Sequence, residues 1–155
     1  MSAIFKDRSK SASSRHAAAV VAAAIVASLA AVPSGAATEL TVSVAGIAAA
    51  RGDIRIAVHA AAGKFPGEGG AVAKAAIPAR PGEIRQSFDL PPGRYAVAVF
   101  HDQNGNGALD KNFVGAPKEP YGFSNNVRGR LRAPSFAEAG IVLGTEPLEV
   151  KIGIR

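Results

Sequence analysis

Residues 94–112 read RYAVAVFHDQNGNGALDKN, and this stretch indicates both the fold class and the place to look for chemistry. Its first half alternates Tyr95, Val97 and Val99 with alanine and ends at Phe100. Apolar residues at every second position predict a β-strand, and apolar residues on both faces are typical of a strand in the middle of a sheet. The second half is a loop rich in Asp, Asn and Gly.

The same alternation recurs along the chain between turn signals. A Pro-Pro-Gly turn at residues 91–93 precedes the central strand, and the segment LPPGRY at 90–95 resembles a hairpin of transthyretin-like and immunoglobulin-like sandwiches. Further strands are predicted over Glu39–Ile47, Gly52–Ala60, Glu83–Leu90 and Leu148–Arg155, and the Ala-rich segment Ala71–Ile77 is either a weak strand or an irregular crossing. One short helical turn is expected near residues 135–139, where Ser135 and Glu138 have the spacing of a capping box. The pattern predicts an all-β chain, an antiparallel β-sandwich of immunoglobulin-like or transthyretin-like type.

The N-terminal region predicts export. Residues 1–15 carry four basic side chains against one Asp, residues 17–32 carry no charge, and small residues follow up to Ala37. A basic head, a short apolar core and a small-residue exit are typical of a secretory signal peptide, and the apolar run is short for a membrane span. We predict a signal peptide over residues 1–37, cleaved after Ala36 or Ala37, and one β-sandwich domain over residues 38–155 with no membrane span. No twin-arginine pair is present, so the general secretory route and a periplasmic or extracellular location are expected.

Composition narrows the function classes. Without residues 1–37 the chain keeps 14 basic and 11 acidic residues, a net charge of +3. Such a small excess gives little support to nucleic-acid binding, and no nucleic-acid partner is expected. The absence of Cys excludes disulfides, a thiol nucleophile and a Cys-ligated zinc ion. A domain of 118 residues must then be held together by its core, which this length allows.

The loop after Phe100 holds the candidate metal site. Its Asp-x-Asn-x-Asn-Gly pattern matches the first half of a calcium loop, in which alternate residues direct oxygen atoms to one point. The predicted calcium ligands are Asp102, Asn104, Asn106, the carbonyl of Ala108, Asp110 and, from further along the chain, Glu119. Phe113 stands where an EF-hand has its bidentate Glu, and no flanking helices are expected, so the loop is not an EF-hand.

A structural interpretation of this loop stays open beside the calcium hypothesis. Asn, Asp and Gly form turns without any ion, because their side chains or their backbone freedom suit tight turns. Asp102 and Asn104 would then accept hydrogen bonds from the N–H groups of the loop itself.

Other residue combinations point less clearly to chemistry. No Gly-x-Ser-x-Gly segment is present, and Ser124 lies in a predicted turn. His101 and Asp102 are neighbours in sequence, so on a strand their side chains point to opposite faces and do not pair as base and orienting acid. A zinc site from His59 and His101 lacks a third ligand. We therefore predict no catalytic or cofactor-binding residue, and a hydrolase is the least favoured function.

Two features suggest a binding partner instead. On a strand, Arg128, Arg130 and Arg132 would form one positive row, either a solvated sheet edge or a contact for an anionic partner such as a lipid headgroup or polysaccharide. Tyr121 and Phe123 flank Gly122, and they suit either core packing or a sugar-binding platform. The alternative function is therefore a module that binds a cell-envelope glycan or peptide through residues 121–126 and the arginines.

The run from Phe100 to Asn126 resembles the signature of an uncharacterised bacterial family, the domain of unknown function numbered 2141. The matching segments are His101-Asp102, Leu109-Asp110, GAPKE at 115–119, YGFSN at 121–125 and the later PSF at 134–136. This resemblance implies a signal peptide and a compact β domain, but no activity. The sequence thus predicts an exported, non-enzymatic binding or structural module with a candidate calcium loop.

Overall fold

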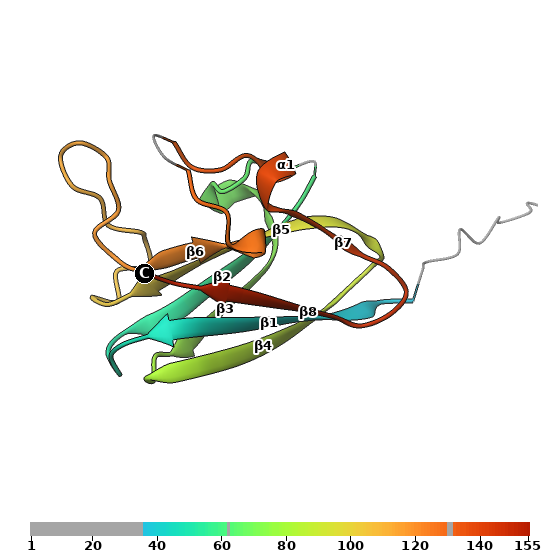
Figure 1. Cartoon of the computed structure of the whole chain (residues 1–155), viewed down its shortest axis with the longest axis horizontal. Coiled ribbons are helices and arrows are strands. Elements are labelled where there is room, and N and C mark those ends of the chain that lie inside the picture. Colours follow the sequence, from blue (N-terminus) through green and yellow to red (C-terminus); the bar gives the residue numbers. More distant parts are fainter. Residues whose placement is uncertain (1–35, 62, 130–131) are drawn as a thin grey trace, which may run out of the picture. The chain divides into compact units, whose positions relative to one another are not determined.

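β-Strands dominate the computed structural model, which describes residues 36–61, 63–129 and 132–155 (Figure 1). The predicted signal peptide lies almost wholly outside the described residues, and so does Arg130 of the predicted arginine row. Within the described ranges, no helix is both long and apolar enough to cross a bilayer.

The strands form two sheets. In the smaller sheet, β1 (Thr38–Ile47) lies between β4 (Gly82–Leu90) and β8 (Leu148–Gly153). In the larger sheet the order is β3 (Ala71–Pro78), β2 (Asp53–Ala60), β5 (Gly93–Asp102) and β6 (Tyr121–Phe123). A further strand, β7 (Gly140–Leu143), pairs with the start of β5. The all-β sandwich predicted from the sequence is confirmed.

One pairing differs from a purely antiparallel arrangement. β8 runs parallel to β1, with Leu40 opposite Leu148 and Val44 opposite Ile152. The other pairings between these strands are antiparallel. A parallel neighbour requires a long connection, and here the whole chain between β1 and β8 supplies it.

The hydrophobic core lies between the two sheets. The inward positions of β1, β2, β5 and β8 follow the alternation expected from the sequence and are almost fully buried: Leu40, Val42, Val44, Ile54, Ile56, Val58, Val97, Val99, Val150 and Ile152. The core residues lie between Leu40 and Ile154. The chain from residue 38 onward therefore encloses its own core and is expected to fold without the residues that precede it.

β5 is the central strand, as its sequence predicted. It pairs along its length with β2, and its other edge pairs with β7 near Arg94 and with β6 near Phe100. Tyr95 fixes the turn before it, because its hydroxyl donates a 2.7 Å hydrogen bond to the Pro91 carbonyl. The strand continues two residues beyond the predicted end, so His101 and Asp102 belong to β5.

Short elements complete the chain. Two 3₁₀ turns, η1 (Glu68–Gly70) and η2 (Ser124–Asn126), precede β3 and follow β6, and α1 (Phe136–Ala139) leads into β7. The predicted capping box is present at α1: Ser135 Oγ accepts from the Glu138 N–H, and Glu138 Oε2 accepts from the Ser135 N–H. The sequence did not predict β6 or β7, because three or four residues are too few to show an alternation.

The predicted arginine row on a strand is wrong for the described residues. Arg128 and Arg132 lie outside helices and strands. Arg128 donates to the Gly153 carbonyl and lies over the ring of Tyr121, 5.6 Å from its centre. Arg132 forms an ion pair with Glu138 at 3.2 Å. Each guanidinium thus has its own partner, and the two do not share a strand.

Candidate functional site

The end of β5 places Asp102 at the centre of the loop that the sequence singled out. Its side chain has no exposed surface. Oδ1 accepts from the N–H groups of Gly105 at 2.8 Å and Asn106 at 3.1 Å. Oδ2 accepts from the Gly107 N–H at 2.8 Å and from Arg55 Nε at 2.7 Å. Both oxygen atoms of the buried carboxylate are therefore occupied by donors.

The charge of Asp102 is balanced by Arg55, which β2 places on the same face. Burial by itself would raise the pKa of the Asp102 carboxyl. The glycine N–H groups and the guanidinium of Arg55 outweigh that effect and hold this pKa below its usual value. The backbone at Gly52 also lies close to the backbone of Asp102. Glycine is required at position 52, since a Cβ there would lie 1.9 Å from the Asp102 carbonyl oxygen.

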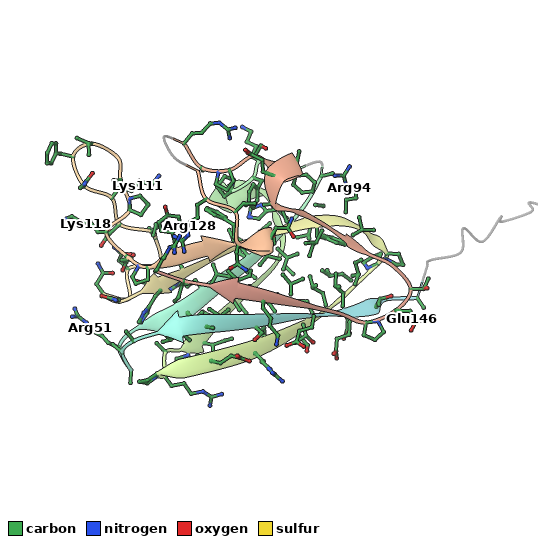
Figure 2. All side chains as sticks on the ribbon, in the orientation of Figure 1. Arg51, Arg94, Lys111, Lys118, Arg128 and Glu146 are labelled. Atoms are coloured by element: carbon green, nitrogen blue, oxygen red, sulfur yellow. The ribbon has the colours of Figure 1, made fainter. Side chains whose placement is uncertain are left out.

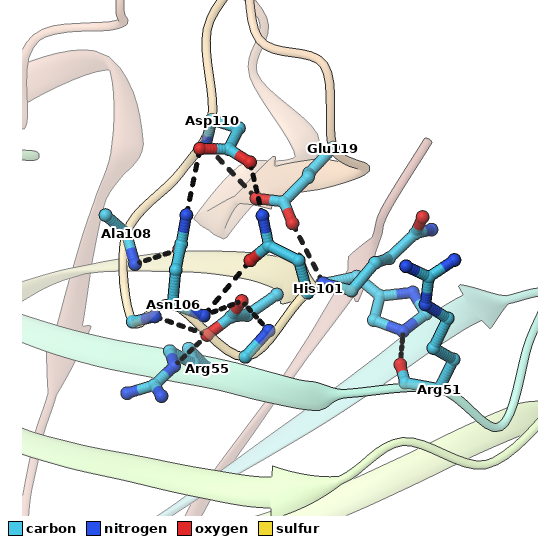
Figure 3. Close-up of polar contacts among 12 residues, drawn as sticks. Arg51, Arg55, His101, Asn106, Ala108, Asp110 and Glu119 are labelled. Carbon is cyan, nitrogen blue, oxygen red and sulfur yellow. Dashed lines mark hydrogen bonds and ion pairs between the residues drawn. The ribbon is translucent and has the colours of Figure 1, made fainter.

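The outer part of the loop is joined by amide side chains (Figure 3). Asn104 Nδ2 and Asn106 Nδ2 donate to the two oxygens of Asp110, at 2.6 Å and 3.0 Å. Their own carbonyl oxygens accept from backbone, Asn104 from the Asn106 N–H and Asn106 from the Ala108 N–H. Each of these side chains therefore closes a turn of the loop.

Glu119 joins the two ends of the loop. It is 7% exposed, and its oxygens accept from the N–H groups of Gln103 and Asp110, at 2.8 Å and 3.1 Å. The fold thus brings the predicted ligands Asp102, Asn104, Asn106, Ala108, Asp110 and Glu119 into one hydrogen-bonded network. In that network Ala108 contributes its N–H group, whereas calcium binding was expected to use its carbonyl.

This geometry corresponds to the structural interpretation that the sequence left open. Each carboxylate of the network already accepts N–H groups, so hydrogen bonds within the protein are enough to hold the loop together. Within the described residues, no group of three or more His, Asp or Glu side chains is arranged to hold a metal ion. Calcium at this loop stays a prediction.

The two histidines of the larger sheet do not meet. His101 lies on the core side, where its Nε2 makes a 2.6 Å hydrogen bond with the Arg51 carbonyl. His59 lies on the opposite face of the sheet and pairs in register with Ala96, whereas His101 pairs with Ile54. The zinc pair considered from the sequence is therefore not formed.

Ser124 has a structural role in this fold. It is fully buried, its Oγ accepts from the Val97 N–H at 2.9 Å, and it donates to the Ala139 carbonyl at 2.5 Å. The amides of Asn125 and Asn126 likewise bond backbone atoms of residues 138–140 and 151–153. This segment ties β6 to α1 and β8, so Ser124–Asn126 have few atoms left for a ligand.

The aromatic residues of β6 pack in a second apolar cluster. Tyr121 and Phe123 are in edge contact at 5.7 Å between ring centres, and Phe65 contacts Phe123 and Phe136 in the same manner. Core packing, one of the two predicted roles for Tyr121 and Phe123, is confirmed for Phe123, which is 7% exposed.

A groove that sequence reasoning missed lies on the outer face of the larger sheet, the face turned away from the core. It has a volume of about 840 Å³. Its lining combines outward strand positions with loop residues 107–109, 111, 114–117, 129 and 132–134, and includes Arg55, Ala57, His59, Lys74, Ala76, Ala98, Phe100, Lys111, Val114, Tyr121 and Arg132. One sequence pattern could have predicted the groove. Alanine occupies outward positions on three neighbouring strands, and its small side chain leaves space above the sheet.

The charges around this groove have one sign. Among the described residues, Arg55, Lys74, Lys111 and Arg132 line it, and no Asp or Glu does. Arg55 and Arg132 have carboxylate partners, Asp102 and Glu138, that are not part of the lining.

His59 adds an unusual group beneath the groove. It is fully buried, and within the described residues neither ring nitrogen has a hydrogen-bond partner. Burial, and then the charge of Lys74, lower the pKa of the ring, and a backbone group of Gly70 opposes this shift without satisfying either nitrogen. The ring is therefore neutral near neutral pH.

Comparison with known proteins gives a family but no characterised relative. Residues 42–151 match the model of a family described as an uncharacterized protein conserved in bacteria, DUF2141. No curated protein and no solved structure matches the chain. The match spans most of the chain, and the protein belongs to this family.

Proposed function

We propose that this member of the family is an exported, non-enzymatic binding module whose ligand lies in the groove on the outer face of the larger sheet. The observation that carries the proposal is the composition of the groove: an apolar floor and, among the described residues that line it, four basic side chains and no acidic one. Clefts of this size, mostly apolar with a few polar groups, are typical of small-molecule sites. The ligand that fits is an apolar molecule with one acidic group.

The electrostatics of the groove support an anionic ligand. Lys111 is exposed and has no ion pair with any described residue. Arg55 lines the groove and uses Nε for Asp102, so its terminal nitrogens are the donors it could offer to a ligand. A carboxylate or phosphate would gain charge-assisted hydrogen bonds from these groups, and a neutral ligand of the same shape would not.

The absence of an activated nucleophile supports a non-enzymatic role. Among the described residues, neither His59 nor His101 shares a hydrogen bond with a serine hydroxyl. A serine nucleophile needs such a base within hydrogen-bond reach.

Export is supported by where the fold begins. β1 starts at Thr38, the residue after the predicted cleavage site, so cleavage after Ala37 would leave the sandwich complete. Mass spectrometry of the protein recovered from a bacterial envelope fraction or the medium tests this. We expect a chain beginning at residue 37 or 38, and an uncleaved chain in the cytoplasm would contradict export.

A fluorescent probe with the proposed chemistry tests the groove. Anilinonaphthalene sulfonate has an aromatic body and one negative charge, and it brightens when it leaves water. We expect saturable binding of one probe to residues 38–155, and at least a tenfold loss of affinity in an Ala57→Phe variant, which fills the floor. Ala45→Phe is the matched control, since Ala45 is also a half-buried alanine on a central strand, but of the other sheet.

Displacement of the probe then identifies the ligand class. Dodecanoate should displace it more strongly than dodecanol, because only the former carries a charge for the basic side chains. Equal displacement by dodecanoate and dodecanol, or equal probe binding by Ala57→Phe and Ala45→Phe, would contradict the proposal. Displacement by neutral oligosaccharides alone would favour the glycan alternative, which shares Tyr121 as a lining residue.

Calcium at the Asp102–Asp110 loop is a separate proposal with its own test. The observation in its favour is that the fold gathers all six predicted ligand residues in one network. It predicts that the melting temperature of residues 38–155 rises with calcium, but not with magnesium or chelator, and that Asp102→Ala abolishes the rise. One melting temperature in all three conditions would remove calcium from the account.

A further inference from the structure

The loop between β5 and β6 ends in a tip that exposes two apolar side chains. Phe113 is 100% exposed and Val114 is 70% exposed. They occupy the two corner positions of a turn from Asn112 to Gly115, whose first carbonyl accepts the Gly115 N–H at 2.9 Å. Polar residues and glycine are the usual choice at such corners, so turn formation gives no reason for Phe and Val there.

The tip is held in one conformation by its own hydrogen bonds. Asn112 Oδ1 accepts from the N–H groups of Val114 and Ala116, at 3.1 Å and 2.9 Å, and the Asn112 N–H donates to the Ala116 carbonyl at 2.8 Å. A bridge between Lys111 and Pro117 closes the hairpin below the turn. The backbone of the tip is therefore fixed by these hydrogen bonds, with Phe113 fully exposed and Val114, which also lines the groove, mostly exposed.

The charges of this loop are segregated. Glu119 is buried at the base, and Asp110 is half-buried with both oxygens bonded to amides. Lys111 precedes the tip and Lys118 follows it; both are exposed and have no ion pair with a described residue. Figure 2 shows both lysines on the part of the loop that projects beyond the sheet. The tip therefore has two exposed apolar side chains, Phe113 and Val114, with a basic residue on each side of them in the chain.

We propose that this tip docks the protein on the surface of an anionic phospholipid bilayer. Phe113 and Val114 enter the interfacial region of the lipid, and Lys111 and Lys118 contact phosphate groups of the surrounding headgroups. The surface area of two exposed side chains is far smaller than the roughly 800 Å² that each partner buries in a stable protein complex. A lipid surface, in contrast, can bind a protein through a few inserted side chains, and each basic residue beside them adds electrostatic attraction to the anionic headgroups.

Tryptophan substitution tests insertion directly, because the chain contains no Trp. In a Phe113→Trp variant of residues 38–155, we expect emission to shift to shorter wavelength with vesicles of phosphatidylcholine and phosphatidylglycerol. Brominated phosphatidylcholine in those vesicles should quench it. Val142→Trp is the matched control: Val142 is as exposed as Val114, at 70%, but β7 places it beside Arg94 at the other end of β5. Its emission should not change.

Cosedimentation with the same vesicles measures how much the inserted apolar side chain and the basic side chains each contribute to membrane binding. Phe113→Ser should lower the partition coefficient by roughly ten- to hundredfold. Lys118→Gln should lower it by roughly fivefold, and Lys64→Gln, an exposed lysine in the loop after the far end of β2, should leave it unchanged. Far-UV circular dichroism checks that each variant is folded.

Several results would overturn the proposal. These are an unshifted Phe113→Trp emission with vesicles, an equal shift in Val142→Trp, or equal binding to vesicles of phosphatidylcholine alone. A shift that appears without lipid and grows with protein concentration would assign the tip to a second copy of the chain. Phe113 does not line the groove, so Phe113→Ser should keep probe binding, and failure of either proposal leaves the other open to its own test.

Discussion

A single buried carboxylate organises the loop at the end of the central strand. Asp102 has donors on both oxygens, three from the backbone of its own loop and one from Arg55 on the neighbouring strand. A buried carboxylate is costly in isolation, but it becomes favourable when N–H groups and a guanidinium replace its hydration. The residue therefore converts a Gly-rich segment, which has high conformational entropy, into a defined structure.

Substitution of Asp102 should reveal this role. Asp102→Asn removes the charge opposite Arg55 and turns amide hydrogens toward existing donors, so we expect a loss of about 2–4 kcal/mol in the free energy of unfolding. Urea denaturation of residues 38–155 measures it. Asp110→Asn is the control, because Asp110 is only half-buried and bonds exposed side-chain amides, and it should cost much less. Equal losses would show that burial at the strand end is not what matters.

At the scale of elements, α1 shows how four residues of helix are held in place. The Ser135 N–H and hydroxyl donate to Glu138, and Arg132 pairs with the same carboxylate. This capping box was predicted because its two residues lie three apart in the sequence, and that spacing does not depend on the rest of the fold. The turn fixes the start of β7, which in turn pairs with β5.

These bonds give the helix a pH dependence. The Ser135 N–H, then its hydroxyl, and then Arg132 lower the pKa of Glu138 from 4.5 to about 2. A carboxyl with a lowered pKa in the folded state stabilises that state above its unfolded pKa. The contribution of Glu138 should thus be complete above pH 4.5 and be lost as the pH falls toward 2. Carboxyl NMR titration should find this low pKa, and Ser135→Ala should raise it. A Glu138 that titrates at its ordinary value would contradict the geometry.

At the scale of the whole molecule, β8 closes the sandwich. Its inward residues Val150 and Ile152 belong to the core shared by both sheets, and β6 comes so close that a Cβ on Gly122 would lie 2.8 Å from Ile152 Cγ2. Because β8 pairs with β1, the last strand completes a sheet that the first strand begins. The fold is therefore complete only when the C-terminal strand is in place.

Truncation of Ile152 tests this closure. The side chain is fully buried, so Ile152→Ala should lower the free energy of unfolding by about 2–5 kcal/mol. Lys151→Ala, on the exposed face of the same strand, should change it by no more than about 0.5 kcal/mol. Chemical denaturation of both variants provides the comparison. Similar values for the two would indicate that β8 contributes little to the core.

Patterns in the amino-acid sequence were enough to predict the strands that alternate over several residues, the central place of β5, the capping box and the position of the polar loop. These features follow from local periodicity and local hydrogen bonding, which one segment carries alone. The contact between Arg55 and Asp102 could not be predicted in this way, because strand register sets which residues become neighbours across a sheet. The groove and the separation of His59 from His101 depend on the same register. The parallel pairing of β8 with β1 and the separate partners of Arg128 and Arg132 were also beyond local pattern, since contacts between distant segments are fixed by the packing of the whole chain.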